Sequence, residues 1–83
     1  MKILKFFTPT CMPCRALGKI LDKIDVEVVS VNATEDLYKV DEYGVCTTPT
    51  LVFLDNDNKE FARVTGMTTQ SKIQEIIDNN RRI

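Results

Sequence analysis

The sequence predicts an α/β protein with the element order β-α-β-α-β-β-α, folded as a four-stranded mixed sheet flanked by helices. Short apolar or β-branched runs alternate with segments whose apolar residues recur at helical spacing. The first strand, helix and strand have the order and length of a right-handed βαβ unit with parallel strands. The last two strands are separated only by turn residues, which indicates a hairpin. We therefore expect one domain over residues 1–83, with helices on both faces of its sheet.

The first βαβ unit is predicted within residues 2–31. Residues 2–8, KILKFFT, carry apolar side chains on both faces, as is typical of a strand buried in a parallel sheet. Behind the two cysteines comes a helix, because apolar residues recur there at helical spacing while charged residues occupy the other side. These apolar residues are Ala16, Leu17, Ile20, Leu21 and Ile24. Residues 26–31, VEVVSV, are short and β-branched and predict the second strand.

The next two elements are a short helix and an apolar strand. Residues 34–44 predict the helix, with Thr34 as its N-cap, acidic residues in its first turn and Gly44 where it ends. Residues 48–55, TPTLVFLD, predict the strand. The sequence DNDN at its end is typical of a turn.

A partner strand and a final helix complete the sequence. Residues 59–66, KEFARVTG, predict the second strand of the hairpin. Residues 68–80 predict the helix, in which an apolar stripe is formed by Ile73, Ile76 and Ile77. No linker, repeat or low-complexity segment interrupts the order.

The charge balance argues against several classes of partner. The formal net charge of -1 offers no bulk attraction for nucleic acid or an anionic membrane. No apolar run approaches the length of a membrane span, and no signal peptide is recognisable at the N-terminus. We therefore expect a cytoplasmic protein that binds neither nucleic acid nor membrane.

The cysteine count and the absence of histidine limit the chemistry. Three cysteines are an odd number, which argues against a secreted disulfide framework, and structural disulfides are rare in the cytosol. Without histidine, the chain cannot build a Cys-His pair, a Ser-His-Asp triad or a His-bearing zinc site. A reactive thiol must therefore be activated in another way.

The position of the sequence CMPC can activate a thiol, because Cys11 falls where the first strand meets the first helix. Unpaired N–H groups and the positive end of the helix dipole favour a thiolate there. Cys14 lies one turn along the same face, within reach for a disulfide, and Pro13 suits the first helical turn. Cys11 would attack a partner's disulfide and Cys14 would then resolve the mixed disulfide. Two unreactive packing cysteines, or two of the ligands of a metal, remain as alternatives.

In combination, four motifs resemble the thioredoxin family over nearly the whole chain: Cys11, Pro13 and Cys14; Tyr43, Gly44 and Val45; Pro49 and Thr50; and Gly66. The resemblance implies a thioredoxin fold without the leading β-α pair, and so of glutaredoxin size. It implies a monomeric thiol-disulfide oxidoreductase that reduces protein disulfides. The Cys11–Cys14 disulfide would be its redox centre, with no further cofactor and no metal. Its partners would be disulfide-containing proteins and, as electron donor, a flavoprotein of the thioredoxin-reductase type.

The resemblance also implies a substrate groove. Pro49 would be a cis proline facing the cysteines, so that the backbone of Thr48 can pair with an extended substrate strand. Gly66 would let a loop approach the same groove. An ordinary proline at a strand start and a plain turn glycine are the alternatives. Thr10, Met12 and Pro13 would complete the substrate-binding set.

Three residues depart from the family pattern. Thr10 stands where thioredoxin usually has tryptophan, and Met12 stands where it has glycine, which puts substrate range in doubt. Lys5 stands where thioredoxin has a buried aspartate. It either modulates the proton or thiolate of the cysteines, or lays its stem along the sheet with its ammonium in water.

Cys46 is an additional thiol near the expected active site. It is either a small buried hydrophobe or a regulatory, glutathionylated thiol.

Three other functions remain open. A glutaredoxin-like, glutathione-dependent reductase is one, although residues 65–69, TGMTT, lack the Gly-Gly and acidic residue expected of it. A Cu(I) carrier that uses the CMPC pair is the second, although such domains end in a strand. The third is a binding module whose redox chemistry is incidental.

Overall fold

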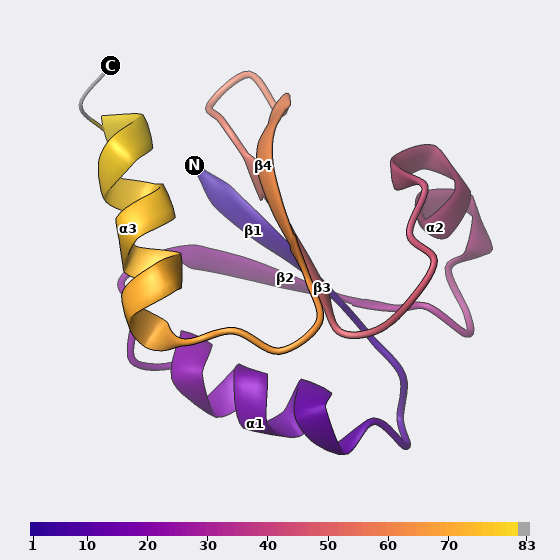
Figure 1. Ribbon diagram of the computed structural model, residues 1–83. Helices are drawn as coiled ribbons and strands as arrows, with labels where there is room; N and C mark the ends of the chain where they lie inside the picture. Colours follow the sequence, from indigo (N-terminus) through magenta and orange to yellow (C-terminus); the bar gives the residue numbers. More distant parts are fainter. Residues whose placement is uncertain (82–83) are drawn as a thin grey trace.

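A computed structural model describes residues 1–81, and their elements follow the predicted order (Figure 1). Four strands form one sheet with the order β2-β1-β3-β4, in which β1 is parallel to β2 and antiparallel to β3, and β4 is antiparallel to β3. The elements are β1 (Lys2–Phe7), α1 (Met12–Leu21), β2 (Glu27–Asn32), α2 (Leu37–Tyr43), β3 (Thr50–Leu54), β4 (Glu60–Thr65) and α3 (Gln70–Arg81). The mixed sheet predicted from the sequence is confirmed.

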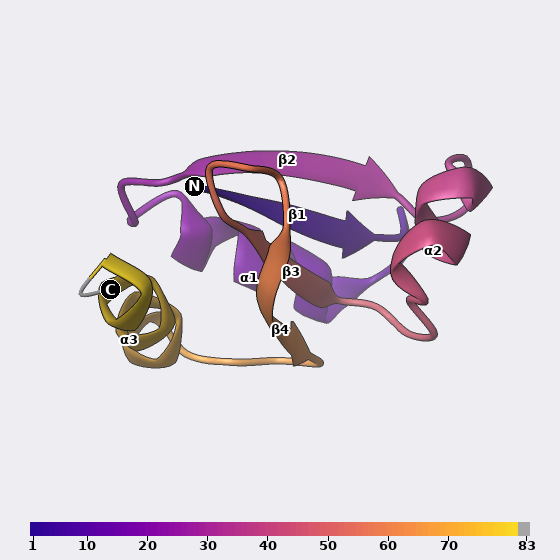
Figure 2. The ribbon, with the colours of Figure 1, turned by 90° about the horizontal axis from the view of Figure 1, so that it is seen from above.

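Helices cover both faces of the sheet, as expected. Helices α1 and α3 lie on one side and α2 on the other, and the view from above separates α2 from the other two helices (Figure 2). The core on the α1 and α3 side includes Ile3, Leu17, Leu21, Leu51, Phe53, Ile73 and Ile77. The smaller core on the α2 side includes Leu4, Phe6, Val31, Val52 and Leu54. Strand β3 is buried along its whole length because it contributes to both cores.

The ends of the first two helices differ from the sequence prediction. Helix α1 ends at Leu21, so Ile24 is buried outside it. Helix α2 has Asp36 as its N-cap, not Thr34, because Asp36 Oδ1 accepts a 3.1 Å hydrogen bond from the amide of Lys39. No acidic residue lies in the first turn of α2, which is a second correction.

Asn32 explains the late start of α2. Its side-chain oxygen accepts hydrogen bonds of 3.0 and 2.7 Å from the amide and hydroxyl of Thr34. Those bonds hold Thr34 in a turn instead of at a helix end. The predicted end of α2 is confirmed, since Gly44 has the left-handed φ of 61° and its amide donates to carbonyls of the last turn.

The register places the end of β1, the start of β3 and the end of β4 at the same end of the sheet. Phe6 near the end of β1 pairs with Thr50 at the start of β3, and Thr50 pairs with Thr65 at the end of β4. The loop that carries Cys11 leaves β1 at this same end. The 48–49 segment enters β3 there, so these separate parts of the sequence lie at the same end of the sheet.

Candidate active site

The two cysteines of the CMPC sequence form a disulfide at the start of α1, with their Cα atoms 5.2 Å apart. Cys11 is the N-cap of the helix in an extended conformation, with φ of -87° and ψ of 105°. Its Sγ accepts a 3.1 Å hydrogen bond from the amide of Cys14. Pro13 lies in the first helical turn, as predicted, where its missing N–H leaves no carbonyl without a partner.

The two sulfurs have different surroundings. Cys11 is partly exposed, whereas Cys14 is buried with only 3% of its surface accessible. The amide that points at Cys11 Sγ and the positive end of the α1 dipole both favour negative charge on that sulfur. The geometry therefore provides one accessible sulfur in an anion-stabilising position and one sheltered sulfur beside it.

Pro49 and Gly66 are in contact at the end of the sheet from which the Cys11 loop leaves. The Thr48–Pro49 bond is cis, and the amide of Gly66 donates a 2.8 Å hydrogen bond to the carbonyl of Pro49. Gly66 has a φ of 88°, which only glycine adopts readily. Pro49 is buried and Thr48 half-buried. The cis bond expected from the resemblance is therefore present. Both views place the start of β3 near the start of α1 (Figures 1 and 2).

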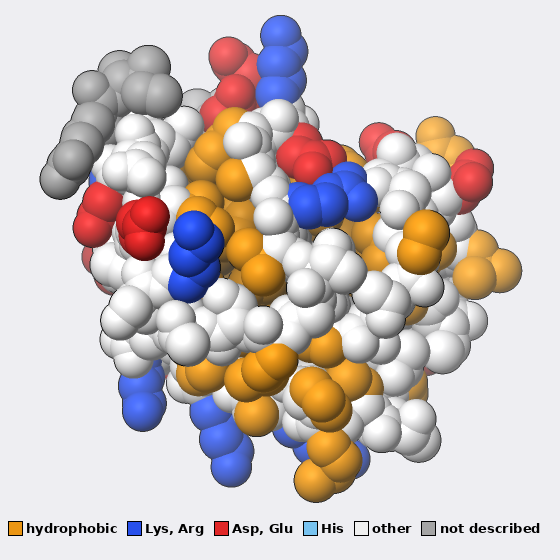
Figure 3. Space-filling model, viewed as in Figure 1, with side chains coloured by type: hydrophobic (Ala, Val, Ile, Leu, Met, Phe, Trp, Pro, Cys, Tyr) orange, Lys and Arg blue, Asp and Glu red, His pale blue; other side chains and the backbone are white. Residues whose placement is uncertain are grey.

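Exposed methionines flank the same region. Met12 is 69% exposed and Met67 is 50% exposed, both unusually high for large apolar side chains. Figure 3 shows hydrophobic side chains gathered over the start of α1 and the connection between β4 and α3. Thr10 is also exposed. Sequence reasoning missed Met67, although its place directly after Gly66 was a usable signal.

Lys5 lies behind the disulfide, on the face of the sheet that α1 covers. Its side chain is half-buried, and Nζ lies 5.6 Å from the centroid of the Phe7 ring. Nζ is also 3.0 Å from the position that a Cβ would take on Gly18 of α1. The ammonium therefore rests against the backbone of α1.

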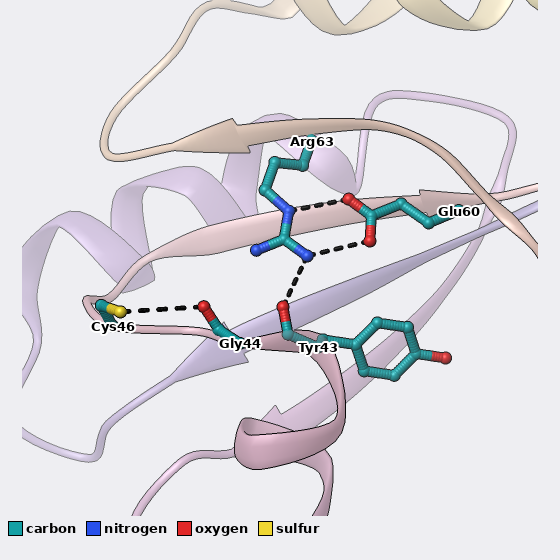
Figure 4. A network of polar contacts seen from close by, with 5 residues as sticks. All are labelled: Tyr43, Gly44, Cys46, Glu60 and Arg63. Atoms are coloured by element: carbon teal, nitrogen blue, oxygen red, sulfur yellow. Dashed lines mark hydrogen bonds and ion pairs between the residues drawn. The ribbon is translucent and has the colours of Figure 1, made fainter.

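Cys46 is an exposed free thiol, so its expected role as a small buried hydrophobe is wrong. The segment after α2 turns at Gly44, and Cys46 Sγ lies 3.7 Å from the Gly44 carbonyl oxygen in the loop before β3 (Figure 4). Nearby, the side-chain hydrogen bond to Glu60 raises the pKa of Arg63. The sequence around Cys46 has no strand or helix periodicity, so its exposure was not readable from a pattern.

Comparison with known proteins agrees with the site. The thioredoxin family model matches residues 1–79. A thioredoxin from Chlamydia caviae is 31% identical over 83 residues, which cover 94% of this chain and 80% of that protein.

The chain belongs to the thioredoxin family.

One further relative and one solved structure also match nearly the whole chain. The NADPH-dependent thioredoxin reductase 3 of Arabidopsis thaliana is 31% identical over 86 residues, a match to 95% of this chain and 16% of that protein. The structure of thioredoxin 1 from Thermosipho africanus superposes with a TM-score of 0.82 at 23% identity, covering 99% of this chain and 96% of that one. The fold is thus a short thioredoxin fold, and the family relationship with the Cys11–Cys14 disulfide supports thiol-disulfide oxidoreductase chemistry.

Residues 1–81 lack two further features. No group of three or more His, Cys, Asp or Glu side chains is arranged to hold a metal ion there. Within the same range, no helix is long and apolar enough to cross a membrane.

Proposed function

We propose that this thioredoxin-family protein reduces disulfides in other proteins, with Cys11 as the attacking and Cys14 as the resolving cysteine. The observation that carries the proposal is the asymmetry of the pair. Cys11 is partly exposed and its Sγ accepts the amide of Cys14, whereas Cys14 is 3% exposed. A partner disulfide can reach the first sulfur and not the second, so the order of the two steps follows from access and from charge stabilisation.

The reaction transfers two electrons from the cysteine pair to the substrate. The Cys11 thiolate attacks one sulfur of the substrate disulfide, forms a mixed disulfide and expels the other substrate sulfur as a thiolate. The Cys14 thiolate then attacks Cys11 Sγ. The Cys11–Cys14 bond forms, the bond from Cys11 to the substrate breaks, and the second substrate thiolate leaves. The expelled thiolates take protons from water.

The substrate groove is proposed to lie between the start of α1 and the Pro49–Gly66 contact. Met12 and Met67 supply exposed, adaptable apolar surface on its walls. Thr48, half-buried beside the cis bond, would offer its backbone to an extended substrate segment.

Thr10 and Pro13 are exposed beside the disulfide and complete the proposed substrate contact. Thr10 adds polar rather than aromatic surface there, so we expect affinity to come mainly from the methionines and from backbone pairing.

The proposed electron donor is a flavoprotein of the thioredoxin-reductase type. Membership of the thioredoxin family supports this class of donor, and residues 65–69 lack the Gly-Gly and acidic residue expected of a glutathione-dependent reductase. A glutathione-dependent cycle remains a second candidate. Incubation of the oxidised protein with NADPH and a bacterial thioredoxin reductase, or with glutathione, separates the two donors by the rate at which Cys11 and Cys14 become reduced.

Insulin reduction and mixed-disulfide trapping together test the proposed function. The protein with dithiothreitol should reduce insulin faster than dithiothreitol alone, and a Cys46→Ser variant should retain that activity. Cys14→Ser should accumulate mixed disulfides on Cys11, whereas Cys11→Ser should accumulate none. Mass spectrometry of the trapped proteins identifies substrates. Bound copper in the purified protein without insulin reduction would replace this proposal with the metal-carrier function.

A further inference from the structure

Lys5 is a charged side chain on the face of the sheet that α1 and α3 cover. It lies in the central strand β1, between Ser30 of β2 and Leu51 of β3. Ile3, two residues earlier and on the same face, is fully buried in the core beneath α1 and α3. Its ammonium lies over the Phe7 ring, with Nζ 5.6 Å from the ring centroid. Within residues 1–81, Lys5 forms no ion pair with a carboxylate.

The Lys5 ammonium lies against α1 at Gly18. Nζ lies 3.0 Å from the position of a Cβ on Gly18, so a side chain there would require the flexible end of Lys5 to shift by a few tenths of an ångström. Glycine inside a helix is destabilising relative to alanine, and at this position it leaves room for the end of the Lys5 side chain. Gly18 follows Cys14 by one helical turn, on the same face of α1.

A small cavity of about 210 Å³ joins Lys5 to the resolving cysteine. Lys5 and Cys14 both line it, and its other lining residues are Phe7, Thr8, Pro9 and Arg15. This lining contains two cations and no carboxylate. Arg15 is exposed and its Nη2 donates a 3.4 Å hydrogen bond to the carbonyl of Pro9, so solvent screens it more than the half-buried Lys5.

The other charged groups near Lys5 all come from α1 and its C-terminal end. Lys19 and Asp22 line a neighbouring hollow together with Lys5 and Arg15. Asp22 is the one carboxylate in that lining, and it is exposed. From β2, the residue facing this hollow beside Lys5 is the uncharged Ser30. The field at Cys14 from this side is therefore positive.

We propose that the Lys5 ammonium stabilises the Cys14 thiolate and thereby speeds the attack of Cys14 on the mixed disulfide. This inference rests on the proposed function. Cys14 is 3% exposed, and a buried thiolate needs a nearby positive charge to replace its lost hydration. In the step itself the Cys11–Cys14 bond forms, the bond from Cys11 to the substrate sulfur breaks, and the departing thiolate takes a proton from water. Lys5 keeps its proton throughout and acts as a positioning residue.

The test follows the two thiol steps separately, in the Cys46→Ser background. Reduced protein is mixed with 5,5′-dithiobis(2-nitrobenzoic acid) in a stopped-flow instrument. Attack by Cys11 releases one thionitrobenzoate, and attack by Cys14 on the resulting mixed disulfide releases the second. Lys5→Met should slow the second release by about three- to tenfold at neutral pH, the effect of a nearby cation of intermediate exposure. It should also move the pH midpoint of that second step upward.

Three variants make the result specific. Lys19→Met removes the same charge from the exposed side of α1 and should leave the second step unchanged. Lys5→Arg should retain most of the rate. Lys5→Gln removes the charge but keeps a polar side chain, and it should slow the second step as Lys5→Met does.

An unchanged second step in Lys5→Met, or equal slowing by Lys19→Met, would overturn the role of Lys5. If Lys5→Met fails to fold, Lys5→Gln decides the matter by the same measurement. Insulin reduction by the Cys46→Ser background tests the proposed function independently: an inactive background protein would refute that function, whereas an active one with an unaltered Lys5→Met step refutes only this inference.

Discussion

The guanidinium of Arg63 in β4 donates a 2.6 Å hydrogen bond from Nη2 to the main-chain carbonyl of Tyr43, twenty residues earlier at the end of α2. The same group forms hydrogen bonds of 2.7 and 2.8 Å with the carboxylate of Glu60 on its own strand (Figure 4). The edge of the sheet therefore holds the end of α2, directly before the segment that leads to Pro49.

Loss of the Arg63 contact should destabilise the protein. Both side chains of the Arg63–Glu60 pair are about one-third exposed, at 31% and 32%, so their charged hydrogen bonds are partly screened. We expect Arg63→Met to lower the free energy of unfolding by about 1 kcal/mol, measured by urea denaturation. Lys72→Met is the matched control, because the Lys72–Glu75 pair is 4.0 Å long and more exposed. Its loss should change the stability by less than about 0.5 kcal/mol. Equal effects of the two variants would contradict a structural role for Arg63.

Stability should fall in acid partly through Glu60. The side-chain hydrogen bond from Arg63 holds the pKa of Glu60 below its ordinary value of 4.5. A carboxyl group with a depressed folded pKa stabilises the fold above its unfolded pKa and loses that contribution as the pH falls through its folded pKa. The urea midpoint of the wild type should therefore decline below about pH 4.5. Glu60→Gln should be less stable at neutral pH and show a shallower acid decline; an identical decline would exclude Glu60 as a contributor.

The left-handed end of α2 should require glycine. Gly44 has a φ of 61°, and nothing lies within 4 Å of the position of an added Cβ, so backbone conformation alone opposes a side chain. We expect Gly44→Ala to lower the free energy of unfolding by about 1 kcal/mol. Gly44→Asn should lower it less, because asparagine tolerates this conformation better. Thermal unfolding of both variants measures the difference, and equal losses would mean that the helix end rearranges.

Cys46 should be the reactive thiol of the oxidised protein. It is exposed and free, whereas Cys11 and Cys14 are joined. Thionitrobenzoate release from the oxidised protein should correspond to one thiol per chain, and Cys46→Ser should abolish it without denaturant. A residual thiol in oxidised Cys46→Ser would show that the Cys11–Cys14 disulfide is incomplete.

Local sequence patterns were sufficient to predict the helices and strands and the Cys11–Cys14 pair. The β-branched and apolar runs fixed the four strands, because side-chain periodicity acts over a few residues and does not depend on the rest of the fold. Cys11 and Cys14 were identified for the same reason, since three positions along one helix set their distance. The predicted N-cap of α2 was wrong because Thr34 and Asp36 are both capping residue types, two positions apart. The choice between them was made by Asn32, whose side chain binds Thr34 in a turn.

The sequence by itself determined the order of elements, the redox pair and its family, because these depend on neighbours along the chain. Only the tertiary structure decided that Cys46 is exposed, that Arg63 holds the end of α2, and that the Lys5 ammonium rests on Gly18. Each of these depends on segments that are distant in sequence. Sheet register and helix packing bring such segments together, and no local pattern encodes the resulting contacts.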